Sequence, residues 1–262
     1  MNKIKLVNDE IILKDLNDNI ILEETNFNNI KAVKHITLTI VKNCNLVINY
    51  ENINTLAITF NIMENVKFDL SEIKIGINNK AKYEFNLADN SIVNVSKFND
   101  TKNSKELIVF NLNGICSKVF CDFKTISKDK EKYDLVVHHN NKNTVSNINN
   151  SGVNILKGNL IFNVSSFVKK GNINCDVLQN SKIINLVDNK CQINPNLYID
   201  EFDVNASHSA NITKFSQEEM FYLMSRGLSY NETLNLLIRG FLMKNINHQK
   251  KEIITLIDRY WR

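Results

Sequence analysis

Apolar and polar side chains alternate along most of the chain, from about residue 30 to about residue 205. The pattern begins with four apolar triplets that recur about every ten residues: Ile36, Leu38 and Ile40; Leu46, Ile48 and Tyr50; Leu56, Ile58 and Phe60; and Val66, Phe68 and Leu70. A period of two gives each strand one buried face. The sequence therefore predicts a mainly β protein built from many short strands.

The connections between these strands narrow the choice of fold. A sandwich, a barrel and a β-helix all suit short strands with this spacing. The 262 residues include one proline and seven glycines, which are few for a series of tight hairpins. Asparagine tolerates the left-handed conformation and could form corners instead, at positions such as Asn43, Asn45, Asn52, Asn54, Asn61 and Asn65. The pattern favours a β-helix, whose stacked coils bury a continuous core. The irregular repeat length leaves the other two folds open.

The segment 215–242 has a different pattern, which predicts two capped amphipathic helices. Ser216 with Glu219, and Ser229 with Glu232, form capping boxes that satisfy the free amides at a helix start. Apolar residues follow at helical spacing in the second helix and again in a third, terminal one: Leu234, Leu237, Ile238, Phe241 and Leu242, then Ile253, Leu256, Ile257, Tyr260 and Trp261. These faces are expected to cover the β core and the open edge of its last rung. The alternative is that part of this surface is a docking site for another chain.

Charge and cysteine usage argue against several classes of protein. The formal net charge is +4 and no Lys/Arg cluster alternates with aromatic residues, so nucleic-acid binding is not expected. The first residues, MNKIKLVNDEIILK, lack the apolar region of a signal peptide, and no apolar run is as long as a membrane span. The five cysteines include no CxxC pair: Cys44, Cys116, Cys121, Cys175 and Cys191. These features predict a cytoplasmic protein without membrane contact, whose cysteines are mostly buried as small apolar side chains.

Four stretches between Tyr133 and Asn245 carry a family resemblance. They are YDLVVHHNNKNTVSNINNSGV, GNLIFNV, NPNLYIDEFDVNASHSA and FYLMSRGLSYNETLNLLIRGFL. The first stretch matches the family pattern at His139, Asn143, Thr144, Ser146, Gly152 and Val153. All four stretches are similar to motifs of the SufB/SufD family of iron–sulfur cluster assembly scaffolds, and the last stretch is the most specific.

The resemblance implies both a fold and a function. The fold is a right-handed parallel β-helix over residues 1–213, followed by a small C-terminal α-helical region over residues 214–262. The function is that of a non-catalytic scaffold subunit of the SUF complex, which pairs with SufB and docks the ABC-type ATPase SufC. The chain has no Walker A motif, GxxxxGK[ST], in agreement with ATP hydrolysis by SufC. The candidate SufC-docking residues are Phe221, Tyr222, Arg226, Gly227, Leu237, Arg239 and Phe241. Phe221 and Tyr222, with Leu223, are also expected to anchor the first helix to the β core.

Departures from the family pattern favour a short SufD. The signature reads Ala206-Ser207-His208-Ser209-Ala210. SufB members carry a functional Glu at the position of Ser209 and a functional Cys further upstream, and neither is apparent here. Longer relatives carry an N-terminal helical region, whereas this chain starts with strand-like sequence, so the role of that region is not expected here.

His208 is the candidate ligand for iron or for a nascent cluster. The resemblance places this histidine at the interface with SufB, where a neutral imidazole is a suitable iron ligand and SufB would supply the others. No cofactor is expected to bind stably, because iron or a cluster would be held transiently and shared with SufB. The alternative is a hydrogen-bonded histidine with a structural role. Three acids lie close in sequence: Asp200, Glu201 and Asp203. Two of them could orient the imidazole or add oxygen ligands, or they could be solvated carboxylates of a turn.

Two other functions stay open. A SufB-like homodimeric scaffold of a two-component SUF-like system would need no separate SufB, and the chain could form a homodimer in isolation. A carbohydrate-active β-helix enzyme would need paired carboxylates in a cleft, and such enzymes are usually secreted.

Overall fold

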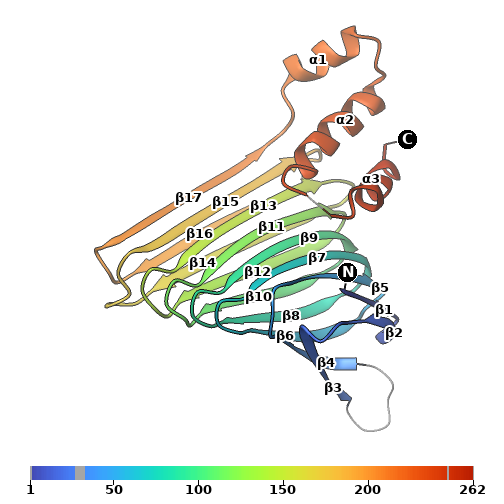
Figure 1. Cartoon of the computed structure of the whole chain (residues 1–262). Coiled ribbons are helices and arrows are strands. Elements are labelled where there is room, and N and C mark those ends of the chain that lie inside the picture. The colour runs from blue at the N-terminus through green and yellow to red at the C-terminus, as the bar shows by residue number, and fades with distance from the viewer. Residues whose placement is uncertain (1, 27–32, 247, 262) are drawn as a thin grey trace.

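Residues 2–26, 33–246 and 248–261 are described by a computed structural model of the chain. Two long sheets run through the molecule and three helices follow them (Figure 1). The first sheet contains β1 (Asn2–Val7), β2 (Glu10–Asp15), β5 (Cys44–Glu51), β7 (Lys67–Ile77), β9 (Ile92–Lys102), β11 (Lys118–Ser127), β13 (Val145–Asn154), β15 (Cys175–Asn185) and β17 (Val204–Thr213). The second sheet contains β3 (Ile20–Asn26), β4 (Val33–Ile40), β6 (Thr55–Ile62), β8 (Lys80–Leu87), β10 (Lys105–Leu112), β12 (Lys130–His139), β14 (Asn159–Val168) and β16 (Gln192–Ile199). The helices are α1 (Gln217–Ser225), α2 (Tyr230–Leu242) and α3 (Lys250–Asp258).

The chain alternates between the two sheets and winds as a β-solenoid of about six turns. From β4 onward, strands two apart in number are parallel neighbours, as β8, β10 and β12 are. At the N-terminal end, β1 pairs with β2 and β3 with β4 in the antiparallel sense. The predicted β-helix is confirmed, because from β4 onward neighbouring strands of a sheet belong to successive coils rather than to hairpins.

A column of left-handed residues forms one corner of the solenoid. The column consists of Asn65, Asn90, Cys116, Asn143 and Asn174. The backbone N–H of each residue donates to a carbonyl of the next coil, as Asn65 does to Asp89 at 2.9 Å. Four of the five are asparagines, the residue that tolerates this conformation best after glycine. The expectation of left-handed asparagines is confirmed at Asn52 and Asn65.

Other asparagines stack along the strands instead. The expectation of left-handed corners was wrong for Asn43, Asn45, Asn54 and Asn61. The side chain of Asn86 donates to Asn61 at 3.0 Å, and that of Asn111 to Asn86 at 2.9 Å, with 25 residues between partners. This spacing is the length of one coil. Each coil has one strand in each sheet and therefore contains two of the apolar triplets seen in the sequence. The ladder satisfies amide groups that would otherwise compete with the strand backbone.

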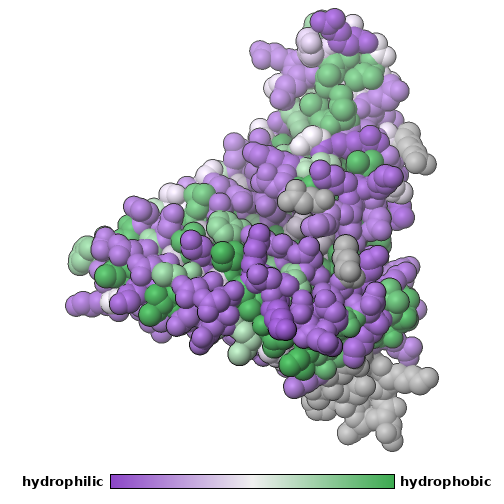
Figure 2. All heavy atoms as spheres, in the orientation of Figure 1, coloured by the Kyte–Doolittle hydropathy of each residue, from purple (hydrophilic) through white to green (hydrophobic). Residues whose placement is uncertain are grey.

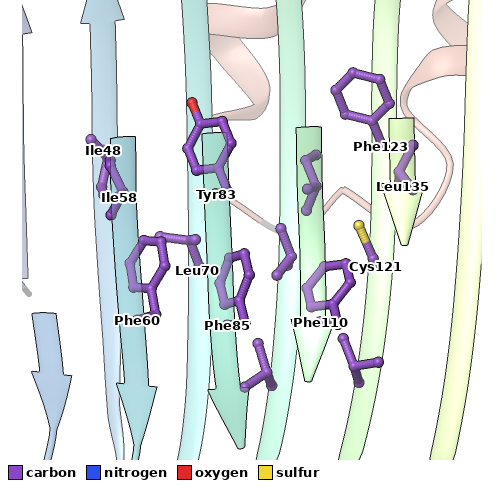
Figure 3. Close-up of a cluster of buried hydrophobic side chains, with 14 of the residues drawn as sticks. Ile48, Ile58, Phe60, Leu70, Tyr83, Phe85, Phe110, Cys121, Phe123 and Leu135 are labelled. Carbon is purple, nitrogen blue, oxygen red and sulfur yellow. The ribbon is translucent and has the colours of Figure 1, made fainter. Parts of the chain in front are cut away.

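Aromatic rings stack inside the solenoid (Figure 3). The rings of Phe60, Phe85 and Phe110 come from β6, β8 and β10, with centroids 4.5 Å and 4.8 Å apart. All three side chains are fully buried. Each contributes roughly 2 kcal/mol through burial, and ring stacking adds to this. The apolar triplets of the sequence therefore do form the core.

A charged cluster lies inside the solenoid as well, at inward positions of β7, β9 and β10. Lys97 Nζ lies 2.7 Å from Glu72 Oε2 and 3.4 Å from Glu106 Oε2. Lys74 Nζ lies 2.8 Å from Glu106 Oε1, and burial lowers the pKa of Lys74 to about 8. All four side chains are buried, and the Tyr50 hydroxyl donates to Glu72 at 2.6 Å. Two lysines thus balance two glutamates where the alternation rule expects apolar residues.

The helices α2 and α3 pack on the outer face of the first sheet. Ile238 and Leu242 of α2, with Ile257 of α3, are fully buried in one cluster with Phe98 and Val153. The Tyr260 hydroxyl and Lys128 both bind the Asp100 carboxylate at 2.7 Å and fasten the chain after α3 to the corners of the solenoid.

The last rung of the solenoid stays uncovered. The strand β17 is the edge of the first sheet, and its residues 205–212 are exposed. The expectation that the helices cover this edge was wrong. The helices instead bury their apolar faces on outward-facing residues of the odd-numbered strands: Ile73, Phe98, Ile126, Val153 and Ile184.

Candidate partner-binding surfaces

His208 lies in the middle of the uncovered edge strand β17. Its Cα pairs with that of Gln179 on β15, and the other side of β17 has no strand beside it in the described part of the chain. The side chain is exposed and makes no hydrogen bond or ion pair with a described residue. The imidazole and the free backbone groups of this edge are therefore open to a partner.

The acidic residues before β17 do not reach His208. Asp203 precedes it by five residues of extended chain, which span about 17 Å. Glu201 accepts backbone hydrogen bonds from Gly171 and Phe202, both at 2.8 Å, and these bonds lower the pKa of its carboxyl. Glu201 is thus a turn carboxylate that holds the corner between β16 and β17.

The adjacent histidines of β12 face opposite sides of the sheet, as side chains in a strand must. His139 is buried, with Nδ1 2.7 Å from Thr144 Oγ1 and Nε2 2.9 Å from Ser146 Oγ. Burial lowers the pKa of His139 to about 4. His138 faces outward and stacks on Phe167 at 5.0 Å. The two cannot form one metal site, and His139 is a hydrogen-bonded core residue.

The helix α1 carries apolar side chains that no described residue covers. None of its residues is buried, Phe221 is 76% exposed and Tyr222 is 58% exposed. The expectation that these two rings anchor α1 to the β core was therefore wrong, while Leu223 is partly buried. Figure 2 shows apolar surface in this part of the molecule, in green near the top of the view. Apolar side chains gathered in this way are typical of an interface.

An apolar groove of about 880 Å³ separates α1 and α2 from the corners of the solenoid. It is lined by Ile155, Leu156, Leu186, Val187, Lys214, Phe215, Gln217, Glu218, Met220, Phe221, Met224, Tyr230, Leu234 and Trp261. The sequence did not predict the side of the groove that the solenoid forms, through Ile155, Leu156, Leu186 and Val187. One signal was available: Leu156 is 66% exposed and left-handed, at a corner where an asparagine would be ordinary.

Arg226 and Gly227 end α1 beside this groove. The Arg226 guanidinium lies 5.3 Å from the centre of the Tyr222 ring. Gly227 has φ +95°, and its N–H donates to the carbonyl of Met224 at 3.0 Å. This is the left-handed helix end that glycine favours. Both residues are exposed.

The candidate docking residues on α2 have internal partners. The Arg239 guanidinium binds Asp258 of α3, with Nε 2.8 Å from Oδ1. Phe241 packs beside the buried helix cluster, with Lys182 Nζ 5.8 Å from its ring centre. Leu237 is partly buried. Among the seven candidates, the most exposed side chains are thus those of Phe221, Tyr222 and Arg226.

Within residues 2–26, 33–246 and 248–261, no group of three or more His, Cys, Asp and Glu side chains is placed to hold a metal ion. All five cysteines are free. Cys121 and Cys175 are buried, and burial raises the pKa of Cys121 to about 12. A buried thiol of this kind packs as a small apolar side chain.

Comparison with known proteins identifies the family. Residues 22–241 match the family described as SUF system FeS cluster assembly, SufBD core domain. The chain belongs to this SufBD family. The matched residues include β4 to β17, the edge that carries His208, and α1. The family expected from the four sequence stretches is confirmed, and it places the protein in iron–sulfur cluster assembly, in a family whose members are generally non-catalytic scaffolds.

Relatives of this SufBD protein include the iron–sulfur cluster assembly protein SufD of Bacillus subtilis, 30% identical over 148 residues, which are 53% of this chain and 34% of that protein. A SufBD family protein of Staphylococcus haemolyticus is 34% identical over 95 residues, 36% of this chain and 19% of the relative. One of Mycobacterium tuberculosis is 32% identical over 108 residues, 38% of this chain and 12% of the relative. The aligned parts thus cover about a third or less of these relatives. In the part of the chain that the structure describes, no helix is long and apolar enough to cross a membrane.

Proposed function

We propose that this SufBD protein is a SufD-like, non-catalytic scaffold subunit that pairs with SufB and docks the SufC ATPase in the cytoplasm. The observation that carries the proposal is the presence of two separate surfaces without an internal partner. One is the edge strand β17 with His208, and the other is α1 with the groove beside it. A scaffold between two partners needs two such surfaces.

The open end of the solenoid suits SufB. Both β16 and β17 are edge strands, so another β-solenoid can extend the two sheets through backbone hydrogen bonds. His208 would then lie inside the interface, where SufB supplies further ligands. Iron or a nascent cluster is the cargo of this shared site and not a resident cofactor of the chain.

The exposed helix α1 suits SufC. Phe221 and Tyr222 are large rings that stay exposed beside an apolar groove, and Arg226 adds a positive charge at the end of the helix. Aromatic and arginine side chains contribute most to binding in protein interfaces.

Retention of SufC tests the docking surface. We expect Phe221→Ala/Tyr222→Ala to bind SufC at least about tenfold more weakly while SufB binding is kept. Ile12→Ala/Leu13→Ala is the matched control, because these two apolar side chains of β2 are 55% and 47% exposed and lie outside both surfaces. Unchanged SufC binding by the α1 variant, measured by titration of purified proteins, would contradict the docking proposal.

Activity of iron–sulfur enzymes in cells tests His208. We expect His208→Ala to keep both partners and to lower this activity, because it removes one ligand without altering the fold. Ser209→Ala, next to it on β17, is the control. Wild-type activity of iron–sulfur enzymes in cells with the His208 variant would show that His208 is not a required ligand.

A SufB-like homodimeric scaffold is the second candidate, and the same open edge would serve it by pairing two copies of this chain. Recovery of two copies with SufC, and of no SufB, would favour this alternative. A chain that acts with SufB should give one copy of each scaffold instead.

A further inference from the structure

A row of lysines crosses the outer face of the second sheet. Lys105 on β10 pairs in register with Lys80 on β8 and with Lys132 on β12. These strands lie side by side (Figure 1), about 4.8 Å apart. The residues that follow the three lysines in sequence are buried, so the lysines themselves point outward. Three ammonium groups therefore leave one face of the sheet at close spacing.

The positive charge of this row is only partly balanced within the chain. Lys132 lies 3.2 Å from Asp134, and the neighbouring Lys82 lies 3.0 Å from Glu84. Lys80 and Lys105 form no ion pair with any residue that the structure describes. Like charges directly opposite each other on adjacent strands destabilise a sheet. An anion placed between them would remove this repulsion.

The row borders a depression of about 430 Å³. Lys80, Lys82, Lys105 and Lys132 all line it. Apolar surface is contributed by Ala57 and Leu107, which pair with Lys82 from either side. A volume of this size is within the usual range for a small-molecule site, roughly 300–1,000 Å³.

We propose that this depression binds a multiply charged phosphate group, either free or carried by a nucleotide. The lysine ammonium is a compact point charge that suits phosphate. A phosphate with several charges can pair with Lys80 and Lys105 and neutralise both, whereas one carboxylate carries a single negative charge. The surface of Ala57 and Leu107 can accept the less polar part of a nucleotide. The site lies apart from β17 and α1, so it stands or falls separately from the proposed docking of SufB and SufC.

Calorimetric titration of the full chain with inorganic pyrophosphate tests the site. We expect one saturable site whose affinity falls as ionic strength rises towards about 0.15 M. Lys80→Gln/Lys105→Gln should weaken the affinity at least about tenfold. Lys169→Gln/Lys170→Gln, between β14 and β15, removes the same charge from another exposed place and should keep the parent affinity. Thermal unfolding should show the row variant at least as stable as the parent, since it relieves like-charge repulsion.

The same titration with ADP separates the two sources of phosphate. Equal affinity for ADP and pyrophosphate would assign binding to the phosphates, and tighter ADP binding would add the apolar surface to the site. Three results would overturn the proposal. The first is no saturable binding of pyrophosphate, and the second is an equal loss of affinity in both double variants. The third is that the chain binds vesicles of anionic lipid but neither pyrophosphate nor ADP.

Discussion

At the level of single residues, His139 couples protonation to the stability of the fold. Burial holds its pKa at about 4, below the ordinary value of 6.5, so the unfolded chain binds a proton more readily between these pH values. Stability is therefore complete above pH 6.5 and falls as the pH decreases towards 4. Between about pH 7 and about pH 4.5, this one histidine lowers the free energy of unfolding by roughly 2 kcal/mol.

Replacement of His139 by Gln should flatten this pH dependence. We expect His139→Gln to lose about 2 kcal/mol less than the parent over the same pH interval, measured by urea unfolding. The exposed Asn205→Gln variant, which changes no titratable group, should keep the parent profile. An identical decline in the parent and the His139 variant would show that other groups cause the acid sensitivity.

Cys116 occupies a left-handed corner in a column of asparagines. Its φ is +59°, which a β-branched side chain tolerates poorly. We expect Cys116→Val to lower the free energy of unfolding by about 1–2 kcal/mol and Cys116→Asn to leave it unchanged or slightly raised. Cys44→Val, within β5, is the control because valine suits a strand. Denaturant unfolding decides, and equal stability of the two valine variants would contradict the corner argument.

Local sequence patterns predicted side-chain contacts correctly where the two contacting residues lie close in sequence. Both capping boxes form as the sequence predicts, with Ser216 and Ser229 each bound to the backbone three residues on. The sequence could not show that Arg239 binds Asp258, because this contact depends on how α2 and α3 pack. It also gave no reason to place Glu72 or Lys97 in the core.

At the level of elements, the buried charges join β7, β9 and β10 inside the solenoid. Lys97→Met would leave Glu72 and Glu106 with Lys74 as their remaining cation, and we expect a loss of about 3–5 kcal/mol in urea unfolding. Lys97→Met/Glu72→Gln removes one charge of each sign and should recover part of this loss. A double variant less stable than the single one would refute charge balance as the cause.

The ion pair between α2 and α3 has a structural role that can be separated from docking. Since Arg239 is partly exposed, we expect Arg239→Ala to cost only about 1 kcal/mol of stability. The reversed pair, Arg239→Asp/Asp258→Arg, should recover stability in the same unfolding assay. SufC binding should survive in both variants, and its loss at full stability would instead make Arg239 a docking residue.

The sequence located the three helices but not the surfaces against which they pack. The apolar face of α2 is buried as its spacing predicts, through Leu234, Ile238 and Leu242. The spacing shows that a face will be buried and does not identify the surface that buries it. The helices α2 and α3 therefore pack on the outer face of the first sheet instead of on the last rung. The rings of Phe221 and Tyr222 on α1 remain exposed.

For the whole molecule, periodicity predicted a mainly β protein and favoured a β-helix over a sandwich or a barrel, while the family resemblance chose among the three folds. Alternation predicted that the apolar triplets point inward, and scarce glycine and proline favoured coils over hairpins. The length of a coil could not be predicted from the sequence, because the coils become longer along the chain. Stacked partners in successive coils are 25 residues apart at Asn86 and Asn111 but 31 apart at Asn163 and Asn194. The open end at β17 followed from the packing of the helices elsewhere, which no local pattern contains.

The proposed scaffold joins two different partners through two separate surfaces. Anaerobic co-expression with SufB and SufC, followed by native mass measurement and visible absorption, tests this arrangement. We expect a complex that contains this chain, SufB and SufC together, with cluster absorption that depends on His208. A monomer that binds neither partner would show that the chain is not such a scaffold.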